Sequence, residues 1–141
     1  MMKEITSVMI LLALCIPALA VDMPNIVGNW TGSYEGPEIN NSTGLNPAGN
    51  FSFYKIGDET WTLIIEKQNG TSFVGKRIIH QMTAPPRKLV GVIGFDNKTI
   101  SMVDEHGYYW GEIISPTEMQ LLRLRIGADR MSAMRMVLTK E

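Results

Sequence analysis

Apolar and polar residues alternate with a period of two along most of the chain that follows residue 27. In residues 27–34, Trp30 and Tyr34 fall on one side of this alternation, while Asn29 and Thr31 fall on the other. Because successive side chains of a β-strand point to opposite faces, the pattern predicts a strand with Trp30 on its buried side.

The same period recurs in a series of later segments that short turns separate. Asn69 and Gly70 form a dipeptide typical of a two-residue hairpin turn. The expected strands, after the first, cover residues 61–67, 73–80, 88–95, 99–104, 108–114, 118–125 and 133–139. These eight strands predict an all-β fold, an eight-stranded antiparallel up-and-down meander barrel, because closure leaves neither edge unpaired.

The segment 115–127 carries a competing helix pattern. Ser115 could cap a helix, with Pro116 at the first helical position, Glu118 completing a capping box and Gly127 as the stop. However, Ser-Pro also begins type I turns, and the segment lies between two β-like runs with short connections. We therefore expect a turn followed by a strand over residues 118–125.

Residues 35–59 are rich in Gly, Pro, Asn and Ser, so we expect a long loop there. A loop of this length is unusual in a compact domain and is often functional. Within it, residues 51–56 could form a short extra strand. The barrel end that carries this loop is the expected entrance for a ligand.

The first twenty residues have the pattern of a cleaved export signal. Lys3 precedes an apolar run over residues 8–16, Pro17 ends the run, and Ala-Leu-Ala at 18–20 is a small-x-small cleavage site. The run is shorter than the roughly 20 residues of a membrane-spanning helix. We therefore expect removal of residues 1–20, which leaves residues 21–141 as a single β-barrel domain. This domain is expected to be secreted or at the cell surface, without a stable membrane anchor.

Composition narrows the classes of function. Cys15 follows Leu14, whereas a lipid-modified cysteine follows a small residue, so we expect an ordinary signal residue and a cysteine-free mature domain. The formal net charge of −1 shows no excess of basic residues, so we expect no binding to nucleic acid.

The sequence leaves open the oligomeric state and the glycosylation of its sequons, which stand at Asn29, Asn40, Asn41, Asn50, Asn69 and Asn97.

The tripeptide Gly28-Asn29-Trp30 resembles the Gly-x-Trp signature on the first strand of calycins, the lipocalin and avidin-like barrels. In that superfamily the tryptophan packs at the closed end of the barrel, and a basic residue just past the last strand lies across its ring. The resemblance implies these structural roles for Trp30 and Lys140, as a cation over an indole face. The cysteines and second signature of lipocalins are absent, and the biotin-binding constellation of avidins is not recognisable. Residues 91–121 also resemble small secreted proteins of unknown function from methanogenic archaea.

The sequence carries no Gly-x-Ser-x-Gly, phosphate-binding loop or HExxH motif. His80 and His106 have no partner at metal-ligand spacing, and the acidic residues beside His106 lie in a predicted turn where charges are ordinary. Glu66, Asp104 and Glu112 could meet as carboxylates, but nothing in their spacing favours it. We therefore expect a protein that is not an enzyme and holds neither a cofactor nor a metal.

Aromatic and arginine residues are the remaining candidates for a site. Inward aromatic rings could line a ligand cavity or fill an ordinary core. The arginines around the last hairpin could form a rim that holds an anionic ligand group, or a solvated outward face, as runs of charge usually do. The candidate ligand-binding residues are Tyr34, Trp61, Phe73, Tyr109, Arg123 and Arg125, and the other two arginines of the hairpin are Arg130 and Arg135.

Two functions from different classes fit these patterns. The first is a non-catalytic binding module for a small apolar or amphipathic ligand. The second is a filled barrel that acts through its outer surface, as a cell-surface or protein-interaction module. An interior cavity of about 300 Å³ or more favours the first function, whereas a packed interior favours the second.

Overall fold

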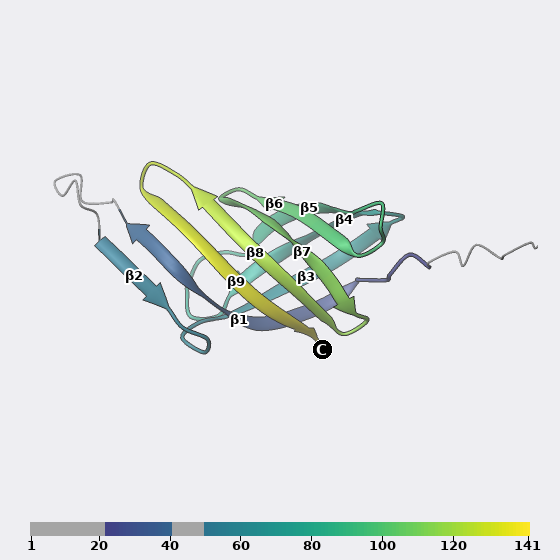
Figure 1. Ribbon diagram of the computed structural model, residues 1–141, viewed down its shortest axis with the longest axis horizontal. Helices are drawn as coiled ribbons and strands as arrows, with labels where there is room; N and C mark the ends of the chain where they lie inside the picture. The colour runs from purple at the N-terminus through teal and green to yellow at the C-terminus, as the bar shows by residue number, and fades with distance from the viewer. Residues whose placement is uncertain (1–21, 41–49) are drawn as a thin grey trace, which may run out of the picture.

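The computed structural model describes residues 22–40 and 50–141, and its strands form one antiparallel sheet (Figure 1). The described segments contain no helix, so none is long and apolar enough to cross a membrane. The strands are β1 (Gly28–Asn40), β2 (Asn50–Tyr54), β3 (Thr60–Asn69), β4 (Ser72–Ile79), β5 (Arg87–Ile93), β6 (Thr99–Asp104), β7 (Gly107–Ser115), β8 (Glu118–Ile126) and β9 (Arg130–Lys140).

The sheet closes on itself because β1 pairs with strands from both ends of the meander. Trp30 lies opposite Leu63 of β3 on one side and opposite Lys140 of β9 on the other. From β3 to β9, each strand pairs with the next along the chain. The eight strands β1 and β3–β9 thus form a closed, antiparallel, up-and-down barrel, as the alternation pattern predicted.

The stretch 35–59 contains more strand than its composition predicted. β1 continues to Asn40, where it pairs with β9 and with the added strand β2, and the expected short strand at 51–56 corresponds to β2. In Figure 1, the end of β1 lies between β9 and the added strand β2. Residues 41–49 lie outside the described residues. The loop prediction was wrong for 35–40 because ladder pairing on two sides outweighs the turn-forming residues Gly36 and Pro37.

The segment with the competing helix pattern is a strand, which confirms the prediction for residues 118–125. Leu121 of β8 lies opposite Gly111 of β7 and opposite Met136 of β9. Ahead of it, the Thr117 backbone N–H donates to Ser115 Oγ at 3.2 Å, as in a serine-initiated turn. Pairing on both sides therefore overrides the local capping signal.

One end of the barrel is sealed around Trp30, whose side chain is fully buried. The Trp30 indole N–H donates to the Ile26 carbonyl oxygen at 2.8 Å, so the segment before β1 lies across this end. Lys140 Nζ lies 5.4 Å from the centroid of the Trp30 ring. Gly32, two residues further along β1, has a steric role: a Cβ there would lie 2.0 Å from the Val137 carbonyl oxygen, so only glycine lets β1 and β9 approach this closely.

The sequons occupy different surroundings. Asn29, Asn50 and Asn69 are exposed, while Asn40 and Asn97 are half-buried. Asn97 has a φ of 56°, a left-handed conformation typical of asparagine in turns. Asn41 lies outside the described residues.

Candidate functional site

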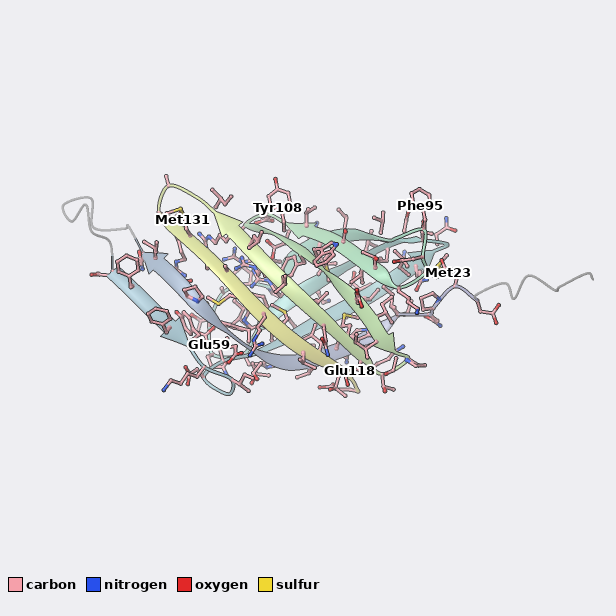
Figure 2. The ribbon with its side chains drawn as sticks, viewed as in Figure 1. Met23, Glu59, Phe95, Tyr108, Glu118 and Met131 are labelled. Atoms are coloured by element: carbon pink, nitrogen blue, oxygen red, sulfur yellow. The ribbon has the colours of Figure 1, made fainter. Side chains whose placement is uncertain are left out.

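Five of the six arginines in the sequence line the inside of one barrel end, which we call the arginine mouth. The mouth lies at the barrel end that carries the β8–β9 turn, opposite the end that Trp30 seals. Met131, labelled in Figure 2, marks the end with the mouth. The described lysines do not line it, and Arg135 points outward to pair with Glu35. The five arginines of the mouth are Arg77, Arg87, Arg123, Arg125 and Arg130.

The deepest layer of the mouth contains two buried cations around one indole. The side chains of Arg77 and Arg123 are 2% and 5% exposed. Their guanidinium carbons lie 4.3 Å and 5.2 Å from the centroid of the Trp61 ring. Cations over an indole face are stabilised electrostatically, and more so when desolvated. Trp61 therefore holds both guanidinium groups close together despite their mutual repulsion.

One carboxylate serves this pair. Asp104 Oδ2 lies 3.0 Å from Arg77 Nε, and the Asp104 side chain is fully buried. The Tyr109 hydroxyl donates to Asp104 Oδ2 at 2.7 Å and accepts from Arg123 Nε at 3.1 Å. The network therefore runs Arg77–Asp104–Tyr109–Arg123 and contains two positive charges for one negative charge.

The electrostatics of this layer follow from burial. Burial lowers the pKa of Arg77; Tyr109 and Asp104 oppose this shift, and the positive charges of Arg123 and Arg87 reinforce it. Burial also raises the pKa of Tyr109, which keeps its hydroxyl neutral as the donor to Asp104. Arginine is effectively always protonated in proteins, so the layer keeps its surplus positive charge.

The rim of the mouth pairs its charges more fully. Arg125 Nη2 lies 3.2 Å from Asp129 Oδ2, and Arg130 Nε lies 3.5 Å from Glu38 Oε1. The Tyr54 hydroxyl donates to Glu38 Oε1 at 3.5 Å. Arg87 has no ion pair with a carboxylate among the described residues, so the rim and the deep pair each keep one positive charge beyond their carboxylates.

Aromatic rings connect the rim with the deep layer. The Tyr34 ring centroid lies 5.5 Å from that of Tyr54 and 4.6 Å from that of Trp61. The Tyr34 hydroxyl donates to Glu59, and burial, followed by this bond and the Glu59 charge, raises the Tyr34 pKa. The three rings thus form an aromatic wall on one side of the arginine mouth.

A small cavity of about 40 Å³ opens at the centre of the mouth. It has room for more than one water but is well below the roughly 300–1,000 Å³ of an ordinary ligand pocket. Three residues of its lining carry a buried N–H donor without a hydrogen-bond partner: Trp61 Nε1, Arg77 Nε and Arg130 Nε. The ion-pair contacts of the two arginine nitrogens thus lack hydrogen-bond geometry. Such donors are costly unless an acceptor meets them.

The structure brings together five of the six residues that the sequence suggested as ligand-binding. Tyr34, Trp61, Tyr109, Arg123 and Arg125 all belong to the mouth or its deep network. The sixth is Phe73, which fills the apolar interior beside Gly91, where a Cβ would lie 2.2 Å from its ring. The positions of Arg123 and Arg125 exclude the solvated outward face for these two residues.

Sequence reasoning did not connect Arg77, Arg87, Asp104 or Glu38 with this site. Two of them carry a readable signal in hindsight. Asp104 continues the inward alternation of Ile100 and Met102, and Arg77 continues that of Phe73. Among the described residues, no group of three or more His, Cys, Asp or Glu side chains is placed to hold a metal ion.

The outer surface carries its own apolar feature, which we call the outer row. Five exposed apolar residues lie opposite one another in register across β4–β8: Val74, Val90, Val103, Tyr108 and Leu124. Figure 2 shows Tyr108 projecting away from the barrel. A surface hollow of about 960 Å³ runs along the first four of these residues.

Comparisons with known proteins give similarity of structure but not of sequence. No family model and no curated protein matches the chain. A redesigned beta barrel matches with a TM-score of 0.49 and 10% identity, covering 82% of this chain and 91% of its own. The structure of EF1p2_mFAP2b bound to DFHBI matches with a TM-score of 0.40 and 12% identity, covering 82% of this chain and 93% of its own. The calycin and archaeal resemblances of the sequence stay predictions.

Proposed function

We propose that the protein is a secreted, non-catalytic binding module that holds the anionic group of a small amphipathic ligand at the arginine mouth. The observation that carries this proposal is the deep layer, where the buried cations Arg77 and Arg123 share the single carboxylate of Asp104. Buried charges in proteins are normally paired, because their desolvation is costly. An anionic ligand would supply the missing charge.

The size of the cavity limits how such a ligand binds. A space of about 40 Å³ fits a compact head group, so the apolar part of the ligand remains at the entrance. Tyr54, Ile79 and Met82 line that entrance and offer apolar surface. By the criterion of about 300 Å³, this volume counts against an apolar ligand enclosed in the barrel and favours a filled interior. The proposal therefore keeps the amphipathic ligand expected from the sequence only in the form of one anchored by its head group at the mouth.

Binding of short amphiphiles tests the proposal. We expect octanoate or octyl sulfate to bind by isothermal titration calorimetry, and neutral octanol to bind far more weakly. Arg123→Gln should weaken binding of the anions roughly tenfold or more, because hydrogen bonds to charged groups contribute about 1.5–3 kcal/mol. Arg135→Gln is the matched control, since Arg135 lies outside the barrel. This variant should bind the anionic amphiphiles with the affinity of the wild type.

The opposite result is equally clear. Octanol binding as tightly as octanoate, or equal affinities for Arg123→Gln and the wild type, would refute an anion-binding mouth. Thermal melts monitored by circular dichroism establish that each variant is folded before it is titrated.

The outer row supports a second candidate function, a cell-surface or protein-interaction module. Exposed apolar residues that form one contiguous patch often mark an interaction site. If the barrel acts through this face, Tyr108→Lys should abolish retention of the protein by envelope fractions of its host, while Arg123→Gln should not. The reverse pattern would favour the arginine mouth.

Export is the part of the proposal that the N-terminal sequence supports. We expect the mature protein to begin at Val21, because the Ala-Leu-Ala site follows an apolar run that Pro17 ends. Intact-mass measurement of protein recovered from outside the host cytoplasm should give the mass of residues 21–141. A chain that retains residues 1–20, or that carries lipid on Cys15, would contradict this. Residues 1–21 lie outside the described residues.

A further inference from the structure

We infer that the arginine mouth selects a tetrahedral oxyanion, the phosphoryl or sulfuryl group of its ligand, over a carboxylate. This inference rests on the proposed function and names the class of the anionic group. The number and placement of unpartnered donors carry it, the balance of charge fits a phosphoryl group, and the use of arginine in preference to lysine supports an oxyanion as the ligand group.

The unpartnered donors come from three separate strands. Trp61 lies on β3, Arg77 on β4 and Arg130 on β9, and each contributes one buried N–H without a hydrogen-bond partner. A carboxylate offers two oxygens that lie in one plane. A phosphoryl group offers three strong acceptor oxygens that are not coplanar with its ester bond. Donors distributed over three strands are therefore better matched by the tetrahedral group.

The charge balance of the mouth accommodates between one and two negative charges. Its five arginines are accompanied by the carboxylates of Asp104, Glu38 and Asp129, which leaves a surplus of two positive charges. The surplus falls to one when Glu59, which accepts from the Tyr34 hydroxyl, is included. A phosphate monoester carries roughly −1.5 to −2 at neutral pH and matches the upper part of this range, whereas a carboxylate or a sulfate monoester carries −1 and matches the lower part.

The choice of cation points to an oxyanion, whether a phosphoryl group or a carboxylate. Arginine presents planar, paired N–H donors that match phosphate and carboxylate oxygens, whereas lysine acts as a point charge. Two of the guanidinium groups, those of Arg77 and Arg123, are already held against Trp61. Because Asp104 and Tyr109 also engage them, these cations lose little freedom when a ligand arrives.

The cavity suits this group by size. Its volume of about 40 Å³ is roughly three times the space that one water needs, enough for a compact oxyanion and too small for a ring or a chain. The ligand could be free inorganic phosphate or sulfate, or an ester that extends out of the mouth. Both share the tetrahedral oxyanion, and binding measurements separate them.

The test compares four probes at constant ionic strength by isothermal titration calorimetry: octyl phosphate, octyl sulfate, octanoate and inorganic phosphate. We expect octyl phosphate and octyl sulfate to bind roughly tenfold or more tightly than octanoate. Arg123→Lys should reduce this preference, because lysine keeps the charge but loses the planar pair of donors. Arg135→Lys, on the outer surface, should retain it.

Each outcome has a defined meaning. Equal affinities of octyl phosphate and octanoate, both lost in Arg123→Gln, would overturn the inference and leave the proposed function standing. Failure of every anionic probe to bind would overturn both. Inorganic phosphate that matches octyl phosphate would support the inference with a free anion as ligand, and a large advantage for the ester would support it with an amphiphile. If Arg123→Lys does not fold, Arg87→Lys at the half-buried edge of the cluster makes the same comparison.

Discussion

Replacing Trp30 with alanine should lower the free energy of unfolding by about 3–5 kcal/mol, the usual cost of deleting a buried aromatic side chain. Trp30 is fully buried and donates its indole N–H to the Ile26 carbonyl oxygen at 2.8 Å. The substitution removes both the ring and the group that holds the segment before β1 across the barrel end. Urea unfolding followed by circular dichroism measures the change.

Two variants serve as controls for this result. Trp110 is the same residue type on the outer face, 55% exposed, so Trp110→Ala should cost far less than Trp30→Ala. Lys140→Ala removes only the cation over the Trp30 ring and should cost about 0.5–2 kcal/mol. An unchanged midpoint for Trp30→Ala would mean that the ring does not seal the barrel, and the Gly-x-Trp motif would lose its structural role.

Replacing Asp104 with asparagine should cost a comparable amount, about 3–5 kcal/mol, because it removes one partner of a buried ion pair. Asparagine keeps the size of the side chain but leaves Arg77 and Arg123 without their shared negative charge. The loss should appear as a lower denaturation midpoint in urea.

A double variant and a surface variant make this prediction specific. Arg77→Met combined with Asp104→Asn should recover part of the loss, because it removes one of the cations that the first change left uncompensated. Asp129→Asn breaks the ion pair with Arg125. Because the Asp129 side chain is 65% exposed, this change should alter the free energy of unfolding by at most about 1 kcal/mol. If Asp104→Asn were as mild as Asp129→Asn, water rather than Asp104 would be neutralising the deep layer.

The strands of the barrel were predictable where the alternation is clean and the turns are short. The stretch 118–125 shows the reason: its helix-capping pattern is local, whereas the pairing of Leu121 with Gly111 and Met136 acts on both sides. The sequence did not predict the second half of β1 as strand, because Gly36 and Pro37 interrupt the alternation of apolar and polar residues there. Only pairing with β2 and β9, which the sequence does not display, makes that stretch a strand.

The sequence indicates which face of its strand each site residue occupies, but not which residues of different strands the closed barrel brings together. Arg123 and Arg125 share a face with the buried Met119 and Leu121, so an inward orientation was readable. The charge of these two residues instead favoured an outward orientation, because isolated arginines seldom face a core. The compensating residues lie on other strands. Strand register places Trp61 near Arg123 and links Asp104 to Arg123 through Tyr109, and this register is a property of the closed barrel.

Pairing between β1 and β9 has a consequence for how the chain can be connected. The Glu141 backbone N–H donates to the Asn29 carbonyl oxygen at 3.0 Å, and Lys140 Nζ donates to the Asn25 carbonyl oxygen at 3.3 Å. The segment that precedes β1 and the end of β9 therefore lie together at the barrel end sealed by Trp30. A circular permutant that joins these ends by a short linker and opens the chain at the exposed Asn69-Gly70 turn keeps every ladder between strands. In such a permutant the seam that closes the barrel becomes an ordinary hairpin, and the order of the strands around the ring stays the same.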